Sequence, residues 1–160
     1  MPQADGLGMA AGVPDTVMAP RSLAAHNAER ASLSLPPLRW NCHLEQDASE
    51  WAQALLRQGA LAHADAGTRK GIGENLWMGT SGRWPLEQMI GRFIEEKQQY
   101  RHGRFPDVSV TGNGADVGHY SQIVWRDTRE VGCALARDSA RDVLVCRYYP
   151  AGNVQGRVPF

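Results

Sequence analysis

The chain lacks several features that would assign it to a particular class of protein. Its 160 residues hold no apolar run close to the ~20 residues of a membrane-spanning helix. The 17 basic and 17 acidic side chains cancel, which argues against a nucleic-acid binder with its usual basic face. Lysine is nearly absent, with only Lys70 and Lys97, so arginine supplies almost all the positive charge. The 42% of hydrophobic residues is ordinary for a globular domain.

The first twenty residues also lack the marks of a signal peptide. They have no basic start and no unbroken apolar core, and glycine and proline interrupt them repeatedly. We therefore expect residues 1–20 to form a flexible lead-in, ordered only if something docks them. A single domain would then occupy residues 21–160.

Cysteine is scarce and its count is odd, at three. Cys133 and Cys146 lie on two strand-like runs, and a turn centred between Ser139 and Ala140 would place them directly opposite each other. Facing residues on paired strands are close enough for a disulfide. Cys42 has no evident partner, so we expect a partly buried free thiol, with intermolecular pairing as the alternative.

Hydrophobic periodicity predicts helices alternating with strands. The expected helices cover Pro20–Ala31, the segment between an Asn41 cap and Gly59, and a segment that starts at Pro85. The expected strands are Asn75–Met78, His119–Trp125, Glu130–Ala136 and Asp142–Tyr148. Helices packed on both sides of an antiparallel sheet would bury every apolar face. The sequence thus predicts an α+β fold, a three-layer α-β-α sandwich with a central antiparallel sheet.

Four segments, taken together, carry a family resemblance. They are Asn27-Ala28-Glu29-Arg30, Gly73-Glu74-Asn75-Leu76, Gly118–Thr128 (Gly-His-Tyr-Ser-Gln-Ile-Val-Trp-Arg-Asp-Thr) and Val143–Val154. In this order they resemble the CAP superfamily, the cysteine-rich secretory, antigen 5 and pathogenesis-related proteins. The resemblance runs from about Arg21 to Arg157. No cysteine-rich module follows it, as in the minimal bacterial members.

The resemblance implies the same sandwich and a disulfide between Cys133 and Cys146. It also implies export, and a disulfide would be unusual in a reducing cytosol. We therefore expect a secreted or periplasmic protein whose export signal lies upstream of Met1 or has been removed.

The family has a cleft lined by two histidines and two glutamates. The positions that match this tetrad are His63, Glu74, Glu96 and His119. Next to them, the resemblance implies supporting roles for four further polar residues, Asn75, Tyr120, Ser121 and Gln122.

The choice of Glu96 over Glu95 also follows from helical geometry. At 100° per residue from Leu86, Glu95 falls opposite the apolar face, whereas Glu96 falls at its rim beside Met89 and Tyr100. A carboxylate at the rim can lean into a cleft. We therefore expect Glu96 in the site and Glu95 in solvent.

Two imidazoles and two carboxylates can bind a divalent cation, with zinc the natural choice for nitrogen and oxygen ligands. A metal-free cleft held by histidine–carboxylate hydrogen bonds would use the same residues. The resemblance favours a binding module for a small ligand, a lipid or sterol, or an unknown protein partner. The alternatives are a zinc-assisted hydrolase, and a scaffold whose cleft has lost its function. We expect a monomer that binds no nucleic acid.

Overall fold

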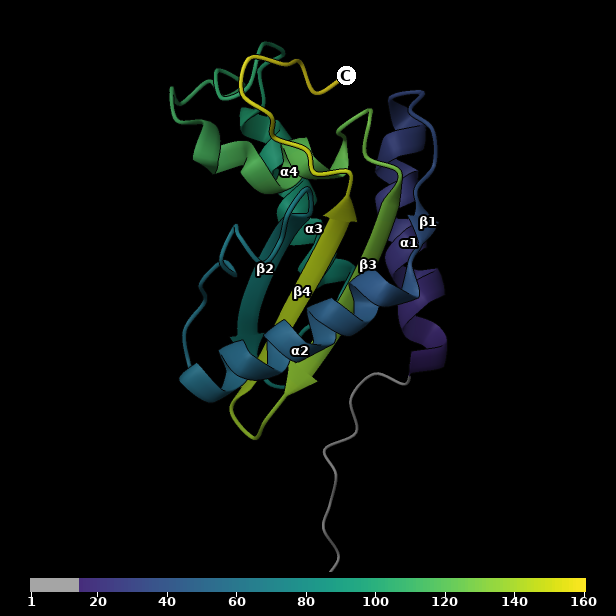
Figure 1. The fold of residues 1–160 in the computed structure, drawn as a ribbon, viewed down its shortest axis with the longest axis vertical. Coiled ribbons are helices and arrows are strands. Elements are labelled where there is room, and N and C mark those ends of the chain that lie inside the picture. Colours follow the sequence, from purple (N-terminus) through teal and green to yellow (C-terminus); the bar gives the residue numbers. More distant parts are fainter. Residues whose placement is uncertain (1–14) are drawn as a thin grey trace, which may run out of the picture.

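A computed structural model describes residues 15–160, in which helices cover both faces of a four-stranded sheet (Figure 1). The order across the sheet is β1-β3-β4-β2, with β1 (Arg39–Trp40) parallel to β3 (Glu130–Arg137). β4 (Arg141–Tyr149) pairs antiparallel with β3 and with β2 (Gly73–Thr80). β2 therefore forms one edge of the sheet.

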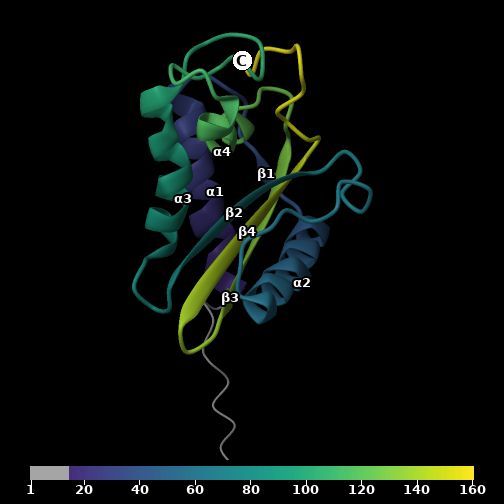
Figure 2. The ribbon, with the colours of Figure 1, turned by 90° about the vertical axis from the view of Figure 1, so that its left-hand side faces the viewer.

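The helices divide between the two faces of the sheet (Figure 2). α2 (Cys42–Gln58) packs against β3 and β4 on the first face. α1 (Asp15–Ser32), α3 (Leu86–Glu95) and the short α4 (Gly118–Ile123) lie on the second. Two 3-10 turns precede α4: η1 (Glu96–Gln99), which continues α3, and η2 (Gly114–Val117). The predicted α-β-α sandwich is confirmed.

The buried central strand β4 serves two cores because its side chains alternate between the faces. Val143 and Val145 join the core under α2, which also holds Ala48, Ala52 and Leu55. Leu144, Cys146 and Tyr148 join the core under α1 and α3, which also holds Met18, Leu86, Met89, Ile90 and Phe93.

The ends of α2 are those that the sequence predicts. The Asn41 side chain accepts hydrogen bonds from the N–H groups of His43 and Leu44, and Gly59 ends the helix at φ 75°. α2 lies so close to β3 that a Cβ on Gly132 would be 2.2 Å from the Glu45 nitrogen. Only glycine allows this approach.

Three expectations about local structure were wrong. α1 begins at Asp15 instead of Pro20, with Met18 buried in the core, so residues 15–20 are helical; the rest of the expected lead-in lies outside the described residues. Cys42 is exposed, because the first residue of α2 projects away from both cores. The segment expected as the strand His119–Trp125 instead forms α4. Within residues 15–160, no helix is long and apolar enough to cross a membrane.

Candidate functional site

The first histidine–glutamate pair lies at the β2 edge of the sheet. Glu74 of β2 has a buried side chain, and its Oε1 accepts hydrogen bonds from His63 Nδ1 at 2.9 Å and from the Ala64 N–H at 3.1 Å. Its Oε2 accepts two from the Arg147 guanidinium, at 3.2 and 3.1 Å. Both carboxylate oxygens are therefore fully engaged.

This environment sets the charge of Glu74. Burial by itself would raise its pKa, but the hydrogen bonds from His63 and Ala64 and the charges of Arg69 and Arg147 outweigh burial. The net result is a pKa below the usual value for glutamate, so Glu74 is a carboxylate at neutral pH. The His63 side chain remains 57% exposed beside it.

The second pair is built where α3 ends and α4 begins. Glu96 Oε1 accepts the backbone N–H groups of His119 and Tyr120, at 3.0 and 3.1 Å, and Oε2 accepts His119 Nδ1 at 2.7 Å. The His119 ring stacks on Phe93, with 4.8 Å between ring centroids. Glu95 instead contacts exposed Arg92. The rim position of Glu96 thus places its carboxylate on His119, as the helical geometry predicted.

The start of α4 explains why a strand was expected there. Tyr120, Ser121, Gln122 and Ile123 are all buried, so neither a helical nor a strand period shows in the sequence. The Glu96 carboxylate supplies acceptors for two N–H groups at the start of α4. It comes from a residue 23 positions away, which no local pattern reveals.

In both pairs the glutamate fixes the tautomer and the orientation of the imidazole ring. An ionised carboxylate only accepts hydrogen bonds, so Nδ1 of His63 and of His119 carries the proton. In the neutral ring each Nε2 then keeps its lone pair, and within residues 15–160 neither Nε2 makes a hydrogen bond. A carboxylate behind the histidine is the arrangement that orients and strengthens imidazole ligands of metals.

The four side chains form two pairs and not one compact ligand set. In the described part of the chain, no three of them offer ligand atoms within 4.8 Å of one another. A pocket of about 250 Å³ lies beside the first pair, lined by His63, Arg69, Ile72, Gly73, Glu74, Gln122, Ala151, Gly152 and Asn153. Glu96 and His119 do not line this pocket.

The residues expected to support the cleft hold α4 in place. Asn75 Nδ2 donates to the His119 carbonyl at 3.1 Å, and the Tyr120 hydroxyl donates to Glu29 at 2.9 Å. The Ser121 hydroxyl donates to Asn153 Oδ1 at 2.6 Å. The Gln122 side chain donates to Thr128 and accepts the Gly152 N–H.

Sequence reasoning missed three residues near the site. Glu29 receives the Tyr120 hydroxyl, and Arg147 holds Glu74 from the neighbouring strand. Asn153 adopts φ 55°, and its side chain donates to the Gly118 carbonyl at 2.8 Å. The sequence signal for all three is that they lie inside family segments, Glu29 in Asn27–Arg30 and both Arg147 and Asn153 in Val143–Val154.

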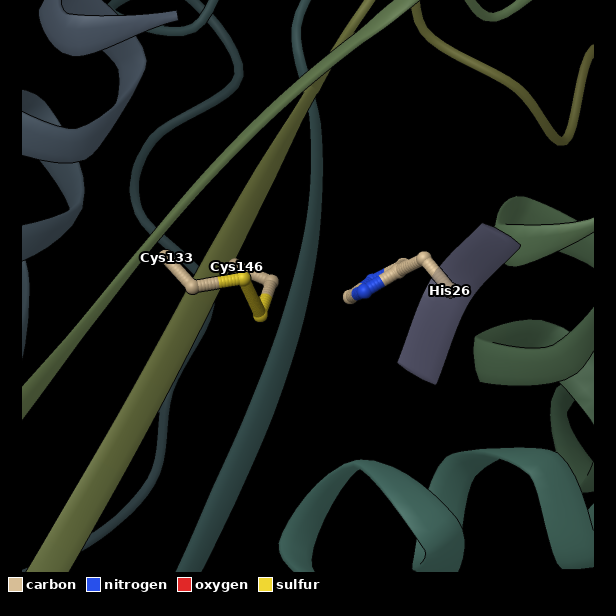
Figure 3. Close-up of side chains that lie close together, drawn as sticks. All are labelled: His26, Cys133 and Cys146. Carbon is tan, nitrogen blue, oxygen red and sulfur yellow. A yellow bond between two sulfur atoms is a disulfide. The ribbon is translucent and has the colours of Figure 1, made fainter. Parts of the chain in front are cut away.

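His26, to which the sequence assigned no role, lies between the disulfide and the site. The Cys133–Cys146 disulfide is present, and the register pairs these residues directly. The His26 ring, fully buried, points toward it (Figure 3). A ring nitrogen and both sulfurs lie within 4.8 Å of one another, but sulfurs bonded to each other are not thiolate ligands.

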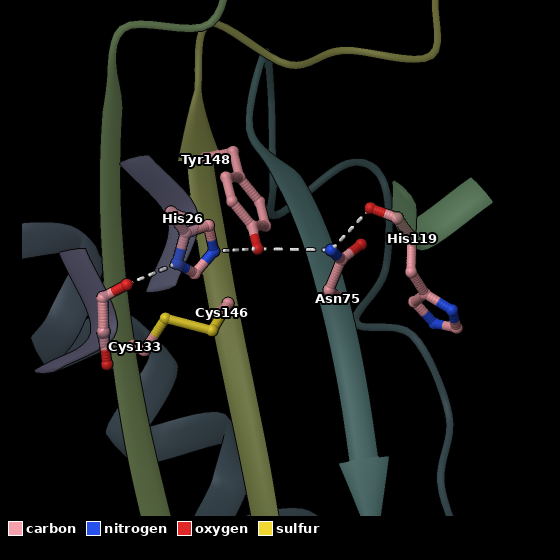
Figure 4. Close-up of a disulfide and its surroundings, with 7 residues drawn as sticks. His26, Asn75, His119, Cys133, Cys146 and Tyr148 are labelled. Atoms are coloured by element: carbon pink, nitrogen blue, oxygen red, sulfur yellow. Dashed lines mark hydrogen bonds between the residues drawn. A yellow bond between two sulfur atoms is a disulfide. The ribbon is translucent and has the colours of Figure 1, made fainter. Parts of the chain in front are cut away.

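A hydrogen-bonded chain leads from His26 to α4 (Figure 4). His26 Nδ1 donates to the Ser22 carbonyl at 2.7 Å, so Nε2 accepts the Tyr148 hydroxyl at 2.8 Å. Asn75 Nδ2 donates to the same hydroxyl oxygen at 3.2 Å and also to the His119 carbonyl. The buried polar groups of the second core thereby fix the backbone of His119.

Comparisons with known proteins agree with this architecture. The chain is 32% identical to pathogenesis-related protein 1C of Nicotiana tabacum over 139 residues, covering 86% of this chain and 78% of the relative. It is 30% identical to pathogenesis-related protein PRMS of Zea mays, covering 86% and 80% of the two chains.

Solved structures share the fold. The crystal structure of NaASP2 with Zn2+ superposes with a TM-score of 0.74 at 24% identity, covering 89% of this chain and 84% of that one. Venom allergen-like protein 4 of Schistosoma mansoni gives 0.66 at 22% identity, with 86% and 90% covered. The sequence model of the cysteine-rich secretory protein family, CAP, matches residues 23–148. This chain therefore belongs to the CAP family of cysteine-rich secretory proteins.

Proposed function

We propose that this protein is an exported binding module that takes up a divalent cation and a small polar ligand at the two histidine–glutamate pairs. The main support is that both histidines are held at Nδ1 by a carboxylate. The lone pair of each Nε2 is then available to a ligand. His63 and His119 would hold the metal, with zinc as the natural ion for imidazole. Glu74 and Glu96 would orient the two rings and would not bind the ion directly.

A bound cation would supply positive charge to polarise or hold an anionic or carbonyl group of the ligand. Imidazoles that are each held by a carboxylate suit Zn²⁺ as ligands. A structural relative, NaASP2, has been solved with Zn2+. This agrees with the proposal.

The pocket beside His63 supports a small polar ligand over a lipid or sterol. Its volume is about 250 Å³, below the roughly 300–1,000 Å³ that is typical of small-molecule sites, and Arg69, Gln122 and Asn153 line it. A sterol requires a larger, mainly apolar cavity. Lipid binding therefore remains the second candidate, which the family resemblance alone supports.

A hydrolase finds less support among the described residues. The Ser121 hydroxyl is buried and donates its one hydrogen to Asn153 at 2.6 Å, so no histidine activates it as a nucleophile. Both oxygens of Glu74 are occupied, and its pKa is lowered, which makes it a weak general base.

Export is part of the proposal. The Cys133–Cys146 disulfide indicates an oxidising compartment, and the family to which the chain belongs is described as secretory. Fractionation of the native organism would test this. The protein should appear in the medium or the periplasm, and its presence in cytosol alone would contradict export.

Calorimetric titration with ZnCl₂ tests the metal site. His63→Ala and His119→Ala should each abolish most of the binding, and Glu96→Gln should weaken it about tenfold because the ring loses its orienting carboxylate. Glu95→Gln is the matched control and should bind as the wild type does, because Glu95 contacts only Arg92 among its described partners.

Two results would refute the metal site. One is a wild-type protein that takes up no zinc at pH 7.5. The other is an equal loss in Glu95→Gln and Glu96→Gln. Native mass spectrometry of the protein purified from its own organism would then show whether an organic ligand occupies the pocket alone.

A further inference from the structure

Five exposed arginines gather around the C-terminal segment, which lies at one end of the fold (Figure 1). They line two adjoining depressions of about 390 and 280 Å³, which share Arg126 and Asp127. We call this set the arginine surface: Arg39, Arg104, Arg126, Arg129 and Arg157. None of the five lines the pocket beside His63.

Backbone hydrogen bonds hold the segments of the arginine surface together. The Arg39 N–H donates to the Arg129 carbonyl at 2.9 Å, which joins β1 to the start of β3. The Arg126 N–H donates to the Pro159 carbonyl at 2.7 Å, and this contact fixes the C-terminal segment. The guanidinium groups therefore extend from a backbone that is already ordered.

The surface has far more positive than negative charge. Asp127 is the single acidic residue among the described residues that line the two depressions, and its carboxylate contacts Arg157. Arg104 donates to a carbonyl, that of Gly156, at 2.8 Å. The whole chain is neutral, with 17 charges of each sign, so this excess is local.

A sixth arginine lies buried beneath the surface. Arg30 of α1 donates to the carbonyls of Pro36, Ile123, Trp125, Arg126 and Thr128. All five acceptors are neutral carbonyls, so no carboxylate offsets the buried charge. Burial and the nearby Arg126 charge lower the pKa of Arg30 to about 10. An anion held by Arg126 would reduce this repulsion.

We propose that the arginine surface binds an acidic polysaccharide that carries sulfate or phosphate groups. Guanidinium groups bind such groups with two parallel hydrogen bonds. Five of them over two adjoining depressions suit a linear polymer with repeated charges better than a single small anion. A lipid surface fits less well, because Val158 is the one large apolar residue exposed on the described lining. The surface is separate from the proposed cation site.

Binding of a defined heparin oligosaccharide, as a sulfated probe, tests the proposal. Affinity measured between 50 and 300 mM NaCl should fall steeply with salt, because binding releases counterions. The double variant Arg126→Ser/Arg129→Ser should bind about tenfold more weakly, with a shallower salt dependence. The matched control Arg57→Ser/Arg83→Ser removes the same charge from positions outside the surface and should bind like the wild type.

Circular dichroism of all variants would confirm that each is folded. Equal losses in the two double variants would show attraction by net charge alone and overturn the proposal. So would a wild type that does not bind heparin at 50 mM NaCl. Vesicles of phosphatidylcholine and phosphatidylglycerol serve as the comparison ligand. Binding to these vesicles without binding to heparin would contradict the polysaccharide as the ligand.

Discussion

His26 is neutral in the folded protein because burial outweighs its hydrogen bond to the Ser22 carbonyl and lowers its pKa to about 4. In the unfolded chain a histidine titrates near ~6.5. Between these values the unfolded state binds a proton that the folded state does not. The stability due to neutral His26 is therefore fully present above pH 6.5 and is lost as the pH falls toward 4.

Between pH 6.5 and about 4, the uptake of one proton on unfolding should lower the free energy of unfolding by about 1.4 kcal/mol per pH unit. Urea unfolding at pH 6.5, 5.5 and 4.5 would measure it. In His26→Gln the free energy of unfolding should fall less steeply with acid, by about that slope. His43→Gln changes an exposed histidine and should leave the slope unaltered. Equal slopes in wild type and His26→Gln would show that His26 is not buried in its neutral form.

Two glycines give opposite predictions for the same substitution. A methyl group on Gly132 would lie 2.2 Å from the Glu45 nitrogen of α2, so Gly132→Ala must push the helix from the sheet. We expect a loss of about 1–3 kcal/mol. Gly91 lies within α3, where an added methyl group would point into open space, so Gly91→Ala should stabilise by about 0.5–1 kcal/mol. Thermal unfolding of both variants checks the pair, and a neutral Gly132→Ala would contradict the close packing of α2.

At the scale of elements, α2, β3 and β4 could be predicted because their own residues determine them. Asn41 and Gly59 mark the ends of α2, and its apolar face repeats with a helical period. α4 could not be predicted, since four of its six residues in a row are buried and its N-terminal acceptors come from Glu96. The start of α1 was missed because Pro20 suggested a boundary, whereas Pro20 lies inside the helix, where it gives up one backbone hydrogen bond.

The candidate site, too, could be predicted only where a local sequence pattern determines it. Glu96 could be chosen over Glu95 from the helical period alone, since the rim of an amphipathic helix is visible in the sequence. That the tetrad separates into two pairs could not be foreseen. The separation depends on Arg147, which engages Glu74 from the next strand, and on the position of α4. Such contacts follow only from the tertiary fold.

At the scale of the whole molecule, the disulfide joins two strands whose pairing spans the centre of the sheet. Cys133 and Cys146 are 13 residues apart, and closing a loop of that size stabilises by about 3 kcal/mol if the effect is the lost entropy of the unfolded chain. The double variant Cys133→Ala/Cys146→Ala should lose about this much in urea unfolding at pH 7. Cys42→Ser should change little, because Cys42 is exposed and unpaired in the described chain. A wild type whose stability is unaffected by reduction would contradict the structural role of the bridge.

The central claim is that the imidazoles of His63 and His119 are each held at Nδ1 by a glutamate and are free to bind a metal at Nε2. Long-range ¹H–¹⁵N NMR of the histidine side chains at pH 7.5, recorded before and after addition of ZnCl₂, tests it most directly. His63 and His119 should both appear as the tautomer protonated at Nδ1, and zinc should shift their Nε2 resonances while those of His26 stay in place. Protonation at Nε2 in either residue, or Nε2 signals that zinc leaves unmoved, would contradict the account.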